Sequence, residues 1–141
     1  MKALLLLILT SCGGLVELTE GLYEITLIET SNSCGWPNGD TGRFTWSIYH
    51  VGKQYGIERA GNGETLSCTS SSDTGEIFCA KDKEATVGDC IYQVAQTVTV
   101  QPENETSFEG TFGIDFISCT SETCGQTAVI KGEWYGYLPT R

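Results

Sequence analysis

Several residue types are scarce in this chain, and each scarcity argues against a class of function. Of 141 residues, only eight are Lys or Arg, against 18 Asp or Glu, which gives a net charge of −10 at pH 7. Such a surface repels phosphate backbones, and no basic stretch offsets it, so we expect no nucleic-acid partner. The acidic residues are spread along the chain, as on a solvated, soluble surface.

Histidine is scarce as well. His50 is the single histidine, so it is the one base of the usual kind for a Ser or Cys nucleophile, and the count argues against a structural zinc site. Two Asp-Thr-Gly triplets, beginning at Asp40 and Asp73, match the triplet of aspartic proteases, but their flanking residues are typical of loops. We therefore predict no enzyme activity, no metal and no cofactor.

Long apolar runs are also missing, and none reaches the roughly 20 residues that a membrane-spanning helix needs. Near the start, Lys2 precedes a short apolar run over residues 3–9 that ends in Leu9-Thr10-Ser11-Cys12. This layout is typical of a secretory signal, and its last four residues resemble the lipobox of bacterial lipoproteins. The resemblance implies cleavage before Cys12 and acylation of Cys12.

The lipobox resemblance also implies a location. Gly13, rather than Asp, follows the cysteine, which in enterobacterial lipoproteins favours the outer membrane. The expected partner is then the membrane itself, through two or three acyl chains that anchor the protein stably. The domain plan is a lipoprotein signal peptide at residues 1–11, a lipid-anchored tether at 12–20 and one β-barrel domain at 21–141. An ordinary secretory signal with an incidental cysteine is the alternative.

The cysteine count agrees with this plan. The chain has seven cysteines, and lipid on Cys12 leaves an even set of six for an oxidising compartment. Three disulfides are therefore possible. The pairs predicted from strand order are Cys34–Cys90, Cys68–Cys79 and Cys119–Cys124, with Cys79–Cys90 as a rival pairing.

Alternating apolar and polar residues dominate the domain, and no stretch has the period of a helix. The clearest strand spans residues 108–118, and Pro102-Glu103-Asn104-Glu105 predicts the turn before it. Eight short strands that hairpins can join predict an all-β, antiparallel, up-and-down barrel, because closure removes exposed edges. A β-sandwich is the alternative. The expected strands cover residues 23–28, 43–48, 54–59, 64–69, 76–81, 91–100, 108–118 and 128–138.

A second resemblance concerns the first strand. Gly21-Leu22-Tyr23 resembles the Gly-x-Trp start of lipocalin-like (calycin) barrels, with Tyr23 in place of Trp. The resemblance implies that Tyr23 plugs the closed end and that a small apolar ligand sits in the barrel. An interior filled by its own side chains is the alternative. The aromatic residues that would line such a cavity are Tyr23, Trp46, Phe112, Phe116 and Trp134.

Two loops, at residues 33–42 and 70–75, are the best surfaces for a partner. Trp36 and Pro37 adjoin Cys34, and an aromatic residue held by a disulfide is common at interfaces; the alternative is a tryptophan that covers the barrel mouth. The leading hypothesis is a lipid-anchored envelope protein with a binding or structural role and an envelope protein as partner. A lipocalin-like carrier of a small apolar ligand is the second hypothesis, and a hydrolase the third.

Overall fold

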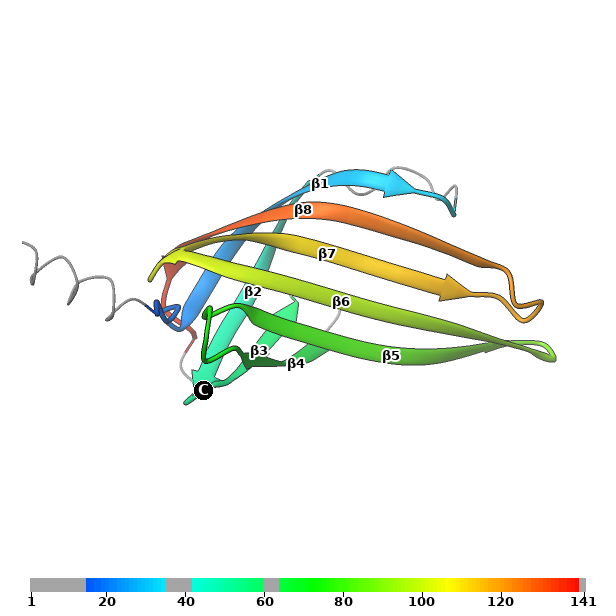
Figure 1. The fold of residues 1–141 in the computed structure, drawn as a ribbon, viewed down its shortest axis with the longest axis horizontal. Coiled ribbons are helices and arrows are strands. Elements are labelled where there is room, and N and C mark those ends of the chain that lie inside the picture. Colours follow the sequence, from blue (N-terminus) through cyan, green and yellow to red (C-terminus); the bar gives the residue numbers. More distant parts are fainter. Residues whose placement is uncertain (1–14, 35–41, 60–63, 140–141) are drawn as a thin grey trace, which may run out of the picture.

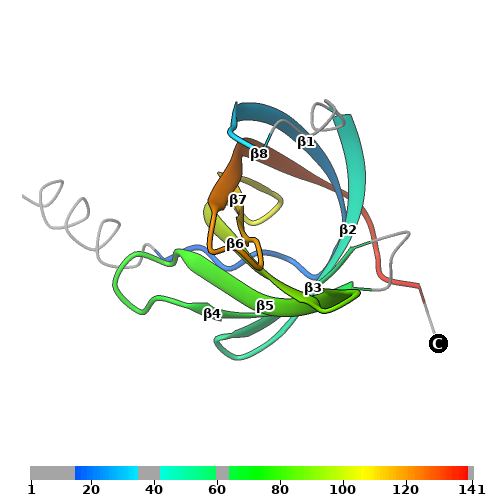
Figure 2. The same cartoon turned by 90° about the vertical axis from the view of Figure 1, so that its right-hand side faces the viewer.

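A computed structural model of the chain describes residues 15–34, 42–59 and 64–139. Eight antiparallel strands follow one another around a closed barrel, and the last pairs with the first (Figure 1, Figure 2). The predicted eight-stranded, all-β barrel is confirmed, and the pairing of first and last strands rules out the sandwich. No helix that could cross a membrane occurs among these residues. The strands are β1 (Gly21–Asn32), β2 (Gly42–Val51), β3 (Gln54–Arg59), β4 (Glu64–Ser70), β5 (Ile77–Val87), β6 (Cys90–Asn104), β7 (Ser107–Ile117) and β8 (Thr123–Gly136).

Large and small side chains fill the closed part of the barrel, around Phe108 of β7. The Phe108 ring lies 5.6 Å from the ring of Tyr23 and 6.5 Å from that of Trp46, measured between centroids. Gly132, opposite Phe108 on β8, has no room for a Cβ atom because the phenyl ring occupies that space. A core packed this closely leaves the space among these rings to the protein's own side chains.

One end of the barrel is sealed by the segment that leads into β1. Leu18 is only 1% exposed and belongs to the core. The Thr19 N–H donates to the Glu105 carbonyl at 2.7 Å, and the Thr19 carbonyl accepts from the Tyr23 hydroxyl at 2.7 Å. Burial raises the pKa of that hydroxyl. Residues 15–20, which the domain plan counts with the tether, therefore pack against the barrel, because Leu18 fills an apolar site.

Five strands continue past the other end of the barrel as an open sheet (Figure 1). β2, β3 and β4 have 10, six and seven residues, whereas β1 and β5 to β8 have between 11 and 15. The β1–β2 ladder stops at Leu27 and Gly42, but the β1–β8 ladder continues to Asn32. The projecting sheet consists of residues 28–32 of β1, 80–87 of β5, 90–97 of β6, 113–117 of β7 and 123–127 of β8.

Several strands run further than predicted, β6 and β5 among them. β6 continues to Asn104 with a register shift beside Pro102, so only Glu105 and Thr106 form the turn. The Pro102 side chain is buried, and a bulge lets the strand pass a residue that lacks an N–H donor. β5 runs to Val87 rather than ending at residue 81.

Of the predicted disulfides, Cys68–Cys79 is confirmed. The two residues lie directly opposite each other on β4 and β5, with both side chains buried. The rival pairing of Cys79 with Cys90 is wrong, because β5 and β6 place these residues far apart along their ladder.

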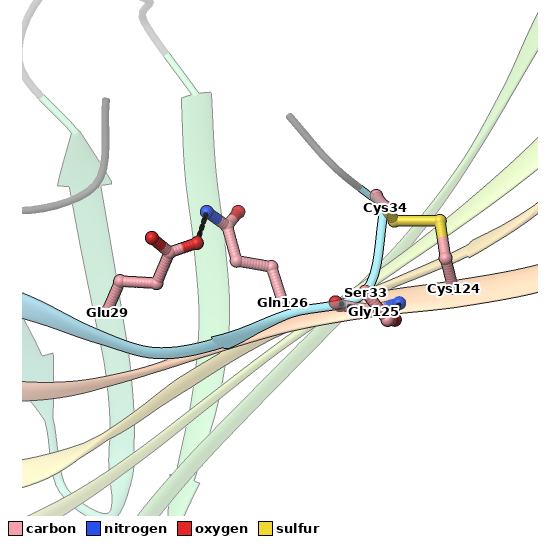
Figure 3. The surroundings of a disulfide bond; sticks show 6 residues. All are labelled: Glu29, Ser33, Cys34, Cys124, Gly125 and Gln126. Carbon is pink, nitrogen blue, oxygen red and sulfur yellow. Dashed lines mark hydrogen bonds between the residues drawn. A yellow bond between two sulfur atoms is a disulfide. The ribbon is translucent and has the colours of Figure 1, made fainter. Parts of the chain in front are cut away.

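The other two predicted pairs are wrong. Cys34 is bonded to Cys124, with Cα atoms 5.0 Å apart (Figure 3), and Cys90 is bonded to Cys119. The reason lies in strand order: β1 neighbours β8, and β6 neighbours β7, so two strands separate Cys34 from Cys90. Each of the three disulfides joins neighbouring strands or the loop that follows one.

Candidate functional site

The inner surface changes character where the barrel opens. On β6 and β7, Val98 and Phe112 are opposite each other and buried, and one row nearer the open end the opposed pair is Gln96 and Ile114. On β5, Lys81 stands opposite Gln96 in that same row. The apolar core therefore ends at one row of side chains, and polar groups begin at the next.

Four charged residues gather at this opening, and we call them the mouth cluster: Arg59, Glu64, Lys81 and Lys83. Glu64 is at its centre, with a side chain only 7% exposed. Its carboxylate lies 2.9 Å from Lys83 Nζ, 3.7 Å from Arg59 Nη1 and 3.8 Å from Lys81 Nζ. Three cations surround one anion, which leaves a local excess of two positive charges.

The cluster lies at a seam in the barrel wall. Among the described residues, β4 and β5 share only three residue pairs, the last of them Cys68 with Cys79. Beyond it, Lys81 Nζ donates to the Thr65 carbonyl at 3.3 Å, and both lysines reach Glu64. Side chains therefore bridge the two strands where the backbone ladder has ended.

Charge compensation determines the state of Glu64. Burial raises the pKa of its carboxyl, but the hydrogen bond from Lys83 and the charges of Lys83, Arg59 and Lys81 together outweigh burial and hold that pKa below its ordinary value. The carboxylate is therefore ionised at neutral pH. Arg59 has a second contact, because its guanidinium carbon lies 5.4 Å from the centre of the Phe112 ring.

Two amide side chains line the same opening. Gln96 is about nine-tenths buried, and its Oε1 atom accepts no hydrogen bond among the described residues. Gln126, on β8, donates from Nε2 to Glu29 Oε1 at 3.0 Å, close to the Cys34–Cys124 disulfide (Figure 3). The inner wall thus carries polar side chains on β5, β6, β8 and β1, which we call the polar band, with Ile114 of β7 between them.

Above this band, the inner face of the projecting sheet is partly aromatic. Lys83, Val94 and Phe116 occupy one row across β5, β6 and β7. Phe116 stacks on Tyr92 with ring centroids 5.3 Å apart, and both rings are half-buried. The aromatic pair therefore lies in and beside the row of Lys83, with Val94 between Phe116 and the lysine.

The five aromatic residues predicted to line one ligand cavity fall in three parts of the fold. Tyr23 and Trp46 are buried in the filled core, and Phe112 lies at its upper boundary. Phe116 belongs to the projecting sheet, whereas Trp134 is half-buried at the sealed end, where its indole N–H donates to the Glu20 carbonyl at 3.1 Å. The open end is lined by charges and amides instead.

Two of the remaining candidates, Asp73 and His50, lie away from this opening. Asp73 lies in the β4–β5 turn, where its N–H donates to the Ser71 hydroxyl at 3.2 Å. His50 is half-buried on β2 and stacks on Tyr55 at 4.8 Å. Cys12, Trp36, Pro37 and Asp40 lie outside the described residues.

Sequence reasoning missed the mouth cluster, although a signal for it was present. Ile77 and Cys79 mark the inward positions of β5, and continuing that alternation places Lys81 and Lys83 on the same face. Ending the strand at residue 81 hid the pattern. A pair of inward lysines opposite an inward glutamate could have been inferred from a longer β5.

The chain matches no family model, no curated protein and no solved structure. Its function is therefore argued from the site itself.

Proposed function

We propose that this protein is a non-catalytic binding module of the bacterial envelope, held by lipid on Cys12 and, by the residue that follows it, at the outer membrane. One observation carries the proposal: the two ends of the barrel differ. The chain enters at a sealed end, where Leu18 is buried, and the polar opening lies at the other end. A protein anchored ahead of Leu18 would turn its opening away from the membrane.

Binding is favoured over catalysis by the chemistry of the opening. Glu64 is ionised and held by three cations, so it is a poor general acid at neutral pH. A charged, half-open inner surface on a rigid barrel is suited to holding a ligand or a partner segment. The filled core gives no support to a lipocalin-like carriage of an apolar molecule deep in the barrel.

Anchoring is tested with the full chain expressed in a bacterium that is fed a palmitate analogue. We expect wild-type protein to be labelled and to sediment with membranes, and Cys12→Ala to lose both properties, since two or three acyl chains are needed for stable attachment. Cys34→Ala, which also removes one thiol, serves as the control and should remain labelled. Label that persists in Cys12→Ala would contradict the proposal.

A further inference from the structure

We propose that the mouth cluster binds the anionic group of an amphipathic ligand whose apolar part lies on the Tyr92–Phe116 pair. This inference rests on the proposed binding role and names the ligand class for it. The ligand is a small molecule or chain end that carries a carboxylate or phosphate next to an aromatic or aliphatic body.

The charge balance of the chain is the first argument. Only eight of its residues are Lys or Arg, yet three of them point at one buried carboxylate. One partner is enough to compensate a carboxylate, as Lys131 and Glu109 show at 3.1 Å on the outer face. The mouth cluster keeps two positive charges beyond that requirement, inside a protein whose net charge is strongly negative.

Access is the second argument. The side chains of Lys81 and Lys83 are 34% and 46% exposed, and that of Arg59 is 25% exposed. Their side chains are therefore partly accessible, while Phe112 lies beneath Arg59 as a buried ring. An anion can approach the cations without disturbing the core.

Gln96 is the third and independent argument. It stands opposite Lys81 on the inner face, and no described residue donates a hydrogen bond to its buried Oε1 atom. Buried polar atoms are nearly always hydrogen-bonded, and an amide can turn over to present its NH2 group. A bound anion beside Lys81 would accept from that group and would satisfy the side chain.

The Tyr92–Phe116 pair indicates the chemistry of the apolar part of the ligand. Lys83 and Phe116 share a row with Val94 between them, and Tyr92 stacks on Phe116. A ligand with its anionic group near Lys83 would therefore place an adjacent ring or short alkyl chain on these two aromatic residues. A free anion without such a body would use the charges only.

The test uses the full chain, folded with its disulfides and kept in nonionic detergent, with calorimetric titrations corrected by detergent alone. The probes are 2-naphthoate and its uncharged analogue 2-naphthamide. We expect the carboxylate to bind at least about tenfold more tightly than the amide, because a charge-assisted hydrogen bond is roughly twice as strong as a neutral one. Equal affinity for the two probes, or no binding of either, would overturn the inference.

Three variants locate the site. Lys83→Gln should weaken naphthoate binding about tenfold and leave naphthamide unchanged, whereas Lys131→Gln, on the outer face, should change neither. Glu64→Gln removes the internal anion and should tighten naphthoate binding; a merely structural cluster would predict weaker binding instead. Near-ultraviolet circular dichroism identifies any variant that fails to fold. Equal affinities in Lys83→Gln and Lys131→Gln would refute the site.

The two proposals fail separately. Absence of naphthoate binding leaves membrane attachment through Cys12 untouched, so a different ligand class would have to be sought for the same module. Conversely, a Cys12→Ala protein that keeps its label refutes the envelope anchor without affecting the titrations.

Discussion

The projecting sheet continues five of the eight strands of the closed barrel, yet different forces hold the two regions. Along β7, Phe112 lies within the ring of eight strands and is buried, whereas Phe116, four residues further on the same face, is only half-buried. Strands β2 to β4 have ended by then, so the second ring lies beyond the closed part of the barrel. The alternation of residues along a strand determines which side chains point inward. Whether those side chains are buried depends on whether the strand lies in the closed part of the barrel.

Covalent bonds replace packing in the projecting sheet. Two of the three disulfides, Cys34–Cys124 and Cys90–Cys119, lie at its far end, and the third is inside the barrel. A sheet with one open face gains little from apolar burial. We therefore expect the two regions to respond differently when a disulfide, a ring or a charge is removed.

The largest effect should follow the loss of Cys34–Cys124. Its partners are 90 positions apart, and the chain-entropy relation gives a loss of about 4 to 5 kcal/mol in the free energy of unfolding for Cys34→Ala with Cys124→Ala. Denaturant unfolding measures the total. Hydrogen exchange should show faster exchange in residues 28–32 while Tyr23 and Ile25 stay protected. Uniform loss of protection along β1 would mean that the two regions are one cooperative unit.

Ring removal gives the next effect and compares the regions directly. Phe112→Ala should cost about 3 to 5 kcal/mol, because it leaves a cavity in a packed core. Phe116→Ala should cost about 1 kcal/mol, since a half-buried ring loses only part of its burial energy. Glu109→Ala, on the exposed face of the same strand, should stay within about 0.5 kcal/mol. Denaturant midpoints measure these losses in stability. Equal losses for Phe112→Ala and Phe116→Ala would show that the inner face of the projecting sheet is covered.

The smallest effect concerns the seam and depends on pH. The folded protein holds the pKa of Glu64 below its ordinary value of 4.5, so the contribution of this carboxylate is present above that pH and is lost as the pH falls through the depressed pKa. Wild type should exceed Glu64→Gln in free energy of unfolding at pH 6, and the gap should narrow steadily as the pH falls below 4.5. Glu84→Gln, on the outer face of β5, is the control. A gap that does not change with pH would mean that the carboxylate acts through packing alone.

The fold could be predicted from sequence because its signal is local. Period-two alternation in eight segments needs no knowledge of distant residues, and β3 falls at residues 54–59 as expected. Boundaries were less certain where alternation continues with charged side chains. Lys81 and Lys83 are inward residues at an opening, and a pattern based on hydrophobicity ends the strand before them.

The disulfides and the site were harder for a physical reason. Local hairpins favoured Cys119 with Cys124, but closure puts the end of β1 beside the start of β8, and that pairing is visible only once all eight strands are arranged. The mouth cluster depends likewise on where β4 and β5 part, which no single strand reveals.

The link between Cys34 and Cys124 has a consequence for how the protein matures. Cys34 is the first of the six bonded cysteines along the chain and Cys124 the last. During synthesis, the four other bonded cysteines emerge before Cys124, the partner of Cys34. Strand β1 cannot pair with β8 until β8 has also been made. An early bond from Cys34 would therefore be a wrong one. Native oxidation is coupled to closure of the ring, and thiol–disulfide exchange is the chemistry that can correct a bond made too soon.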